Sequence, residues 1–460
     1  MPESSPATNS PARLRRALTL WDLVLYGVIV LQPTAPMPVF GVVSDRGHGH
    51  VVTTILLALV AMLFTAIAYG RMARAYPSAG SAFTYVGQEI NPALGYITGW
   101  SMVMDYMLNP LICISWCSSQ AARFAPGVPF WMWAIFFFLM FTGLNLRGIK
   151  TSARVNAGLA AGMGLVVAVF FVAVTRYVFG HPHDGIAFFT RPFFDPATFQ
   201  TGAVLGGTSI AVLTYIGFDG ISTLSEEAEN PRRNILLATV LTCVVVGLLS
   251  AAESYAAQLV WPASEPFPNE VTAFVDVAGR AAAPLSWIMG FTLIVATFGS
   301  GMGAQLGAAR LLFGMGRSNA LPQNFFGAVD RKRRVPRNNV IFVGVIALFG
   351  AFLIPFDLGA EMLNFGALIA FMGVNAASFV RYYLRAPEKK LANLIPPILG
   401  FTVCLLLWLN LSRPAQKWGT IWMLTGIAFG AWKTRGFRGK IIDFDLPPEE
   451  AQATGPSPAP

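Results

Sequence analysis

Long apolar stretches separated by short polar segments run along almost the whole chain. Most stretches cover roughly 18 to 25 residues, which is enough for an α-helix to cross the hydrocarbon core of a bilayer. The pattern therefore predicts an all-α integral membrane protein with about twelve transmembrane helices. The predicted spans are 20–43, 51–70, 95–121, 129–146, 156–179, 200–224, 235–259, 284–314, 338–356, 361–380, 393–411 and 419–433.

Two of these spans are interrupted. The first contains Pro33, Pro36 and Pro38, and proline removes a backbone donor and clashes with the preceding turn, so a helix must break there. The sixth carries Gly217 and Gly220 on either side of an acid. Breaks in the first and sixth spans fit an inverted repeat of five helices plus five with one shared site. Two independent kinks are the alternative, because proline and glycine are common in membrane helices.

Composition and charge support a membrane protein. The 460 residues are 55% hydrophobic and only 12% charged, whereas soluble proteins have about 25% charged residues. The net charge of +9 does not predict a nucleic-acid surface, because the basic residues fall in alternate loops between apolar spans. This positive-inside pattern predicts a multi-pass membrane protein with both termini in the cytoplasm.

The spans also predict the division of the chain. We expect cytoplasmic tails at 1–18 and 434–460, a ten-helix transport core at 19–380, and two further transmembrane helices at 393–433. The four cysteines lie in apolar segments without a metal spacing, and the four histidines lie in predicted outer loops. No cofactor and no metal are therefore expected.

Acidic residues inside the apolar spans are the candidates for chemistry. Asp219 lies in the interrupted sixth span and Asp105 in the third, and a carboxylate there costs several kcal/mol unless it is paired, hydrated or neutralised. If both face one cavity, they suit an organic cation. The alternative for Asp105 is a structural carboxylate. Glu253 in the seventh span either carries a proton or lies close enough to water to need no partner.

Other residues near the breaks complete the predicted site. Aromatic side chains close to the acids in sequence would hold a cation through cation–π contacts, and Glu226 and Glu227 after the sixth span are candidate gate residues. The predicted substrate-binding residues are Asp219, Asp105, Gly217, Gly220, Tyr215, Phe218, Trp116, Gln32 and Thr34, and the candidates for proton coupling are Asp219, Asp105 and Glu253.

At these residues the chain resembles the amino acid–polyamine–organocation (APC) superfamily of transporters, and bacterial putrescine importers in particular. The resemblance covers almost the whole chain apart from its tails and implies a LeuT-like fold with alternating access, usually coupled to a proton gradient or to exchange. It also implies that the protein lies in the bacterial inner (cytoplasmic) membrane. The matching segments are GFDGISTLSEEAENPRRNI, YPSAGSAFTYVGQEINPALGYITGW, ARLLFGMGRSNALPQNFF and LNFGALIAFMGVN.

Two departures from the superfamily bear on the substrate and on proton coupling. Many of its amino acid permeases carry a Gly-Ser-Gly type segment at the first break, whose N–H groups hold the substrate carboxylate. Here the segment is Gln32-Pro33-Thr34-Ala35-Pro36, which is poor in donors and favours an amine without a carboxylate. Proton-coupled members often have a lysine in the fifth span, where this chain has none and Met163 stands near the expected position.

The sequence thus predicts a secondary transporter that imports a small organic cation, putrescine or a related polyamine, by alternating access with proton coupling. An amino acid permease for neutral or cationic substrates, working by symport or exchange, is the alternative within transport. The expected partners are the cationic amine or amino acid, a coupling proton or Na⁺, and the lipid bilayer, with no nucleic acid. A channel would not need an occluding repeat, and no nucleophile–base or metal constellation indicates an enzyme.

Overall fold

The computed structural model describes residues 18–76, 81–147, 153–224, 228–317, 319–330 and 335–436, with the side chains of residues 153–157 and 223 left out. All regular structure in these ranges is helical, apart from one isolated parallel bridge between Leu18 and Ala228. The helices are, in order, α1 (Leu20–Leu31), η1 (Met37–Val39), α2 (Phe40–Arg46), α3 (Val51–Ala75), α4 (Ser81–Glu89), α5 (Pro92–Phe124), α6 (Phe130–Arg147), α7 (Ala153–Gly180), α8 (Ile186–Thr190), α9 (Thr201–Ala211), η2 (Val212–Tyr215), η3 (Phe218–Leu224), α10 (Pro231–Val260), η4 (Glu270–Thr272), α11 (Ala273–Ala281), α12 (Ala283–Arg317), α13 (Gln323–Phe326), α14 (Arg337–Leu353), α15 (Phe356–Phe379), η5 (Val380–Leu384), α16 (Leu391–Leu409) and α17 (Arg413–Lys433).

The predicted all-α membrane architecture is confirmed. Within the described ranges, eight helical segments are long and apolar enough to cross a membrane, with α9, η2 and part of η3 counted together as Thr201–Ser222. Two shorter apolar helices, α1 and α14, and the long helices α5 and α17 occupy the other four predicted spans. The number of spans and the repeat remain predictions beyond this count.

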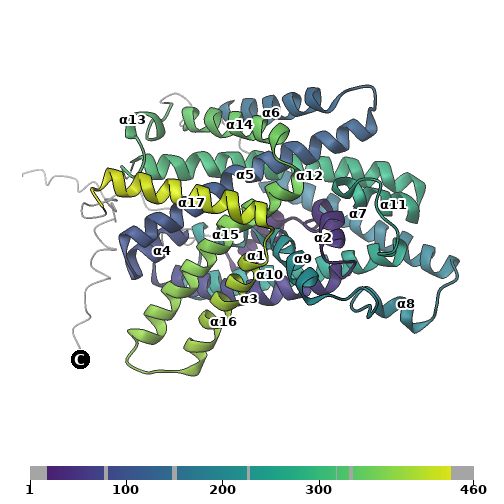
Figure 1. Cartoon of the computed structure of the whole chain (residues 1–460), viewed down its shortest axis with the longest axis horizontal. Coiled ribbons are helices and arrows are strands. Elements are labelled where there is room, and N and C mark those ends of the chain that lie inside the picture. Colours follow the sequence, from purple (N-terminus) through teal and green to yellow (C-terminus); the bar gives the residue numbers. More distant parts are fainter. Residues whose placement is uncertain are drawn as a thin grey trace, which may run out of the picture.

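The long helices lie side by side along the long axis of the molecule (Figure 1). Three packed pairs join the first half of the chain to the second: α3 lies against α10, α5 against α12, and α6 against α14. The first part of the broken first span packs on this bundle, since α1 contacts both α10 and η3. Its other side faces outward, where Trp21 and Leu25 are exposed.

The bundle has two ends that can be named by their short helices. We use the term α4 end for the one that carries α4 and α13, and α11 end for the opposite one that carries α8 and α11 (Figure 1). Four arginines at the α11 end are each paired with an acid: Arg46 with Glu361, Arg123 with Asp276, Arg191 with Asp184 and Arg280 with Glu265.

One buried acid, Glu89, connects α4 to the rest of the bundle through ion pairs. Glu89 is 1% exposed and accepts bonds from Arg381 at 2.9 Å and Arg385 at 2.8 Å, both near the end of the helix that begins as α15. Tyr76 donates to the same carboxylate at 2.7 Å. Burial and this bond raise the pKa of Tyr76 to about 12, so the hydroxyl keeps its proton and remains a donor.

Candidate functional site

The first helix break lies where the prolines predict it. Helix α1 begins with a capping box between Thr19 and Asp22 and ends at Leu31. Gln32 then takes a φ of 69°, which L-residues rarely adopt. Its side-chain Nε2 donates to the carbonyl of Ala296 on α12 at 2.7 Å, which holds the break against that helix.

The second break lies at the predicted glycine. Helix α9 gives way to the 3₁₀ turn η2, then Ile216 is extended and Gly217 has a φ of 120° before η3 begins. A Cβ atom at Gly217 would lie 3.2 Å from Val30 Cγ1 and 3.6 Å from Leu31 Cδ1. The end of α1 therefore lies directly against the second break, and the two interruptions meet.

Both predicted acids lie at this junction. Asp219, in the first turn of η3, is 6% exposed, and Tyr106 of α5 donates to its Oδ2 at 3.4 Å. Asp105 is 7% exposed on α5 and is within range of a direct Coulomb interaction with Asp219. Close contact with α15 holds Asp105 in place, because a Cβ atom at Gly366 would lie 3.2 Å from its backbone nitrogen. The structure thus brings together two acids that are more than a hundred residues apart.

Two tyrosines that the sequence analysis missed complete the wall. Tyr69 of α3 and Tyr85 of α4 are fully buried, and both lie within electrostatic range of Asp219. The ring of Phe218 meets Tyr69 edge-on with centroids 5.4 Å apart and lies 5.3 Å from Phe371 of α15. In the sequence, Tyr69 lies at the end of an apolar stretch, and nothing in its local pattern distinguishes it from an ordinary core aromatic residue.

The remaining predicted residues lie at different distances from the acids. Thr34, in the first break, is 1% exposed, and its hydroxyl has no partner among the described residues. Tyr215 donates to the carbonyl of Ile55 on α3 at 2.9 Å, so its hydroxyl is already used in helix packing.

Trp116 lies three turns beyond Asp105, about 16 Å along α5, and donates to the carbonyl of Val271 in η4 at 2.7 Å. Gly220, one residue after Asp219, has open space where a Cβ atom would be.

Glu253 lies in the second half of α10, towards the α11 end. It is fully buried, and neither carboxyl oxygen has a hydrogen-bond partner within the described part of the chain. The hydroxyls of Ser250 and Ser254 on the same helix are likewise buried and without a partner there. Proximity to water therefore does not explain this acid. Glu226 and Glu227, the predicted gate residues, lie outside the described residues.

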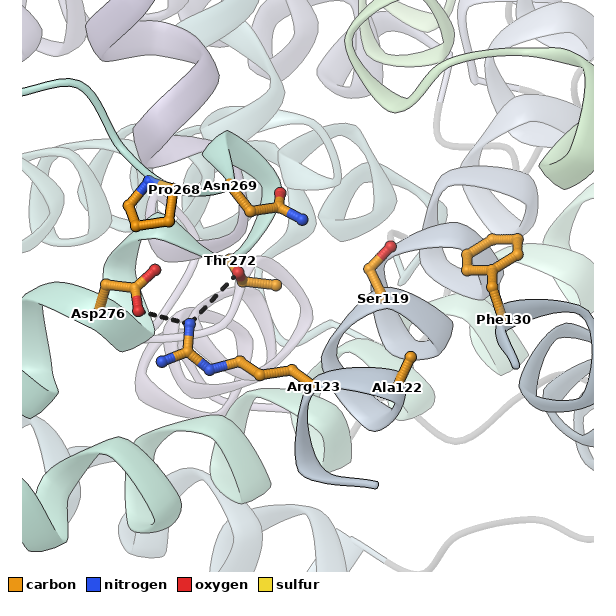
Figure 2. Close-up of a pocket in the computed structure, with 8 residues that line it drawn as sticks. All are labelled: Ser119, Ala122, Arg123, Phe130, Pro268, Asn269, Thr272 and Asp276. Carbon is orange, nitrogen blue, oxygen red and sulfur yellow. Dashed lines mark hydrogen bonds and ion pairs between the residues drawn. The ribbon is translucent and has the colours of Figure 1, made fainter. Parts of the chain in front are cut away.

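A separate cavity of 390 Å³ opens at the α11 end, where η4 and α11 cover the last turns of α5. Figure 2 shows Arg123 reaching from α5 to Asp276 at 2.6 Å and to Thr272 at 3.5 Å. None of the predicted substrate-binding residues lines it. The lining residues are Ser119, Ala122, Arg123, Phe130, Pro268, Asn269, Thr272 and Asp276.

Comparisons with known proteins show the family of this helical membrane protein. The amino acid permease family model matches residues 39–435. The chain belongs to this family. It is 35% identical to the low-affinity putrescine importer PlaP of Escherichia coli (strain K12), over 95% of this chain and 98% of that protein.

More distant relatives of this permease have other substrates in their names. It is 25% identical to the branched-chain amino acid permease BcaP of Bacillus subtilis (strain 168), over 92% of this chain and 93% of that protein. It is 26% identical to the vacuolar cationic amino acid transporter 4 of Arabidopsis thaliana, over 82% of this chain and 65% of that protein. The permease is accordingly a multi-pass membrane transporter for amino acids or polyamines, and not an enzyme.

Proposed function

We propose that this permease imports a small organic cation, putrescine or a related polyamine. The observation that carries the proposal is the pair of buried carboxyl groups, Asp219 and Asp105, at the junction of the two helix breaks. Two carboxylates this close repel each other in a poorly hydrated site, and a diammonium ion relieves that repulsion while it satisfies both. Asp219 binds one ammonium group, and Asp105 binds the second or relays a proton.

The chemistry around the acids favours an amine over an amino acid. Two acids would repel the carboxylate of an α-amino acid. The first break has few N–H donors to hold that carboxylate, because Pro33 and Pro36 have none and the N–H of Ala35 already donates to the carbonyl of Gln32. The printed name of the 35% identical relative, a putrescine importer, supports the same substrate class.

Transport by alternating access in a LeuT-like fold is part of the proposal. Breaks in the first and sixth spans meet at one site, and the helices that pair across the bundle hold equivalent places in two five-helix halves. We place the α4 end in the cytoplasm because basic residues outnumber acids there, with Arg71, Arg74, Arg381 and Arg385 near Glu89, whereas four arginines at the α11 end are each paired with an acid. The chain termini would then both be cytoplasmic.

Proton coupling supplies the driving force in this proposal, and Glu253, Asp219 and Asp105 are the candidate carriers. A carboxyl group that is fully buried without a partner is most stable when protonated, so exposure to the opposite side of the membrane would release its proton. A Na⁺ ion in place of the proton would make uptake depend on the sodium gradient instead.

Uptake of labelled putrescine into proteoliposomes containing the purified permease tests this function. We expect saturable uptake that an inward proton gradient drives and that a proton ionophore abolishes. An imposed sodium gradient at constant pH is the control for the ion. Absence of saturable putrescine uptake together with strong uptake of leucine or lysine would favour the alternative, an amino acid permease, which the two more distant relatives represent.

A further inference from the structure

Tyr69 is a buried polar residue at the two-acid site that the proposed function does not use. It lies on α3, its side chain is fully buried, and its hydroxyl has no hydrogen-bond partner within the described residues. Leaving a hydroxyl buried and unsatisfied typically lowers the folding equilibrium constant by about five- to a hundredfold. A hydroxyl that stays unsatisfied in a binding site is therefore a candidate to form a hydrogen bond with the substrate.

Groups from three other helical segments surround this hydroxyl. Tyr69 is within electrostatic range of Asp219 of η3, of Asp105 and Tyr106 of α5, and of Tyr85 of α4. The hydroxyl is therefore within electrostatic range of both carboxyl groups without bonding to either, and the Tyr69 ring contacts Phe218, the residue before Asp219, with centroids 5.4 Å apart. It is a neutral acceptor at the place where the proposed function puts an ammonium group.

Neighbouring rings fix the direction of the Tyr69 side chain. Its ring meets three other rings edge-on, with centroid distances of 6.2 Å to Tyr85, 5.4 Å to Phe218 and 5.8 Å to Phe371. Edge-on contacts on several sides restrict rotation of the side chain. The hydroxyl is thus preorganised, and a ligand need not order it on binding.

A primary ammonium group matches this arrangement. It has three N–H donors and no acceptor, and a single carboxylate rarely accepts all three in good geometry. We propose that Tyr69 is a specificity-determining residue, whose hydroxyl accepts a hydrogen bond from the ammonium group that Asp219 binds. This inference rests on the proposed function and narrows its substrate class to amines with at least two N–H donors on the ammonium, because a tertiary ammonium has a single N–H, which Asp219 takes, and none left for Tyr69.

Replacing the hydroxyl alone tests the inference. Tyr69→Phe keeps the ring and its edge-on contacts and removes only the oxygen. In proteoliposomes we expect the KM for putrescine to rise about tenfold or more, since a hydrogen bond to a charged group is worth about that factor. The inhibition constant of N,N,N′,N′-tetramethylputrescine, which has one N–H on each ammonium, should change less than threefold.

A second measurement separates a ligand role from a structural one. Because the hydroxyl has no partner, Tyr69→Phe should leave the melting temperature of the substrate-free permease unchanged or raise it. Tyr96→Phe is the matched control: Tyr96 is also fully buried, but its hydroxyl donates to the carbonyl of Gly426 at 3.0 Å. Its loss should lower the melting temperature and leave the KM for putrescine within about twofold.

The results distinguish the inference from the function on which it rests. A wild-type permease that does not transport putrescine contradicts the proposed function itself. The role of Tyr69 is refuted, and the function stands, if the wild type transports putrescine and Tyr69→Phe leaves its KM unchanged. The same holds if Tyr69→Phe raises the KM for putrescine and the inhibition constant of the tetramethylated diamine by the same factor. A fall in melting temperature equal to that of Tyr96→Phe, without a selective change in KM, would also refute it.

Discussion

At the scale of single residues, the site combines charges that the protein alone does not neutralise. Asp219 accepts a long hydrogen bond from the hydroxyl of Tyr106 at 3.4 Å and has backbone hydrogen bonds at the helix break, but no basic side chain pairs with it among the described residues, and Asp105 is within range to repel it. A carboxylate at such depth without a cationic partner is costly. In the proposed function, a positively charged substrate or protons taken up during transport neutralise the two acids.

Neutralising the acids one at a time tests which acid binds which ammonium group of putrescine. Asp219→Asn removes the charge that the first ammonium needs and should raise the inhibition constants of both putrescine and the monoamine butylamine roughly tenfold or more. If Asp105 binds the second ammonium, Asp105→Asn should raise the inhibition constant of putrescine by a similar factor and leave that of butylamine unchanged. Competition against the uptake of labelled putrescine in proteoliposomes measures both inhibition constants. Equal losses for the two amines in Asp105→Asn would exclude a role in binding the second ammonium.

Glu253 is the acid that we expect to link transport to the proton gradient. Glu253→Gln keeps the shape of the side chain but cannot carry a proton, so uptake driven by a proton gradient should fall to the level seen with an ionophore. Exchange of internal for external putrescine, which needs no net proton movement, should continue. Glu265→Gln is the control, because Glu265 lies in a loop at the α11 end and pairs with exposed Arg280. Normal gradient-driven uptake in Glu253→Gln would remove Glu253 from the coupling mechanism.

At the scale of secondary structure, the two interrupted helices place the site. Proline and a positive φ end α1, and a 3₁₀ turn followed by Gly217 ends the regular part of the sixth span. In continuous helices, every backbone group would bond within its own helix. The two breaks interrupt those bonds where the end of α1 meets Gly217, and Asp219 lies there in the first turn of η3.

The backbone at Gly217 should tolerate no side chain. Its φ of 120° is rare for L-residues, and a Cβ atom would lie 3.2 Å from Val30 Cγ1. Gly217→Ala should therefore cost about 1–3 kcal/mol of stability and lower uptake. Gly143→Ala in α6 is the matched control, since a Cβ atom there meets nothing within 4 Å and alanine favours a helix interior. Thermal unfolding in detergent measures both, and equal melting temperatures for the two variants would contradict a strained backbone at Gly217.

At the scale of the whole molecule, packing between the two halves encloses the site, and polar anchors hold the ends. Helices α3, α5 and α6 of the first half lie against α10, α12 and α14 of the second (Figure 1). At the α4 end, Glu89 connects α4 to α15 and η5 through Arg381 and Arg385. At the α11 end, the Arg123–Asp276 pair connects α5 to α11 (Figure 2).

Removing the buried anchor should destabilise the bundle more than removing a surface pair. Glu89→Gln loses the charge that two arginines share, and we expect a cost of roughly 1–3 kcal/mol, limited because both arginines are partly exposed and can be hydrated. Glu388→Gln is the control, because Glu388 pairs with Lys390 while both side chains are about 70% exposed; it should cost less than about 0.5 kcal/mol. Thermal unfolding distinguishes the two, and a similar small shift for both would contradict an anchoring role for Glu89.

The sequence by itself determined the helical membrane architecture, the places of both breaks and the two acids. Hydropathy over about 20 residues decides whether a segment crosses lipid, and proline or glycine decides locally where a helix ends, so no distant contact is needed for either. These features depend only on residues that are close together in the sequence. Asp219 was evident for the same reason, as a charge among apolar neighbours.

Only the tertiary structure decided which side chains share the site. Tyr69 and Tyr85 join Asp219 because α3 and α4 pack beside η3, while the hydroxyl of Tyr215 turns to Ile55 and Trp116 lies three turns from Asp105. A tyrosine in an apolar helix has the same local pattern whether it packs in the core or faces a carboxylate. The difference depends on helix rotation and on contacts between segments far apart in the chain, which hydrophobic periodicity does not encode.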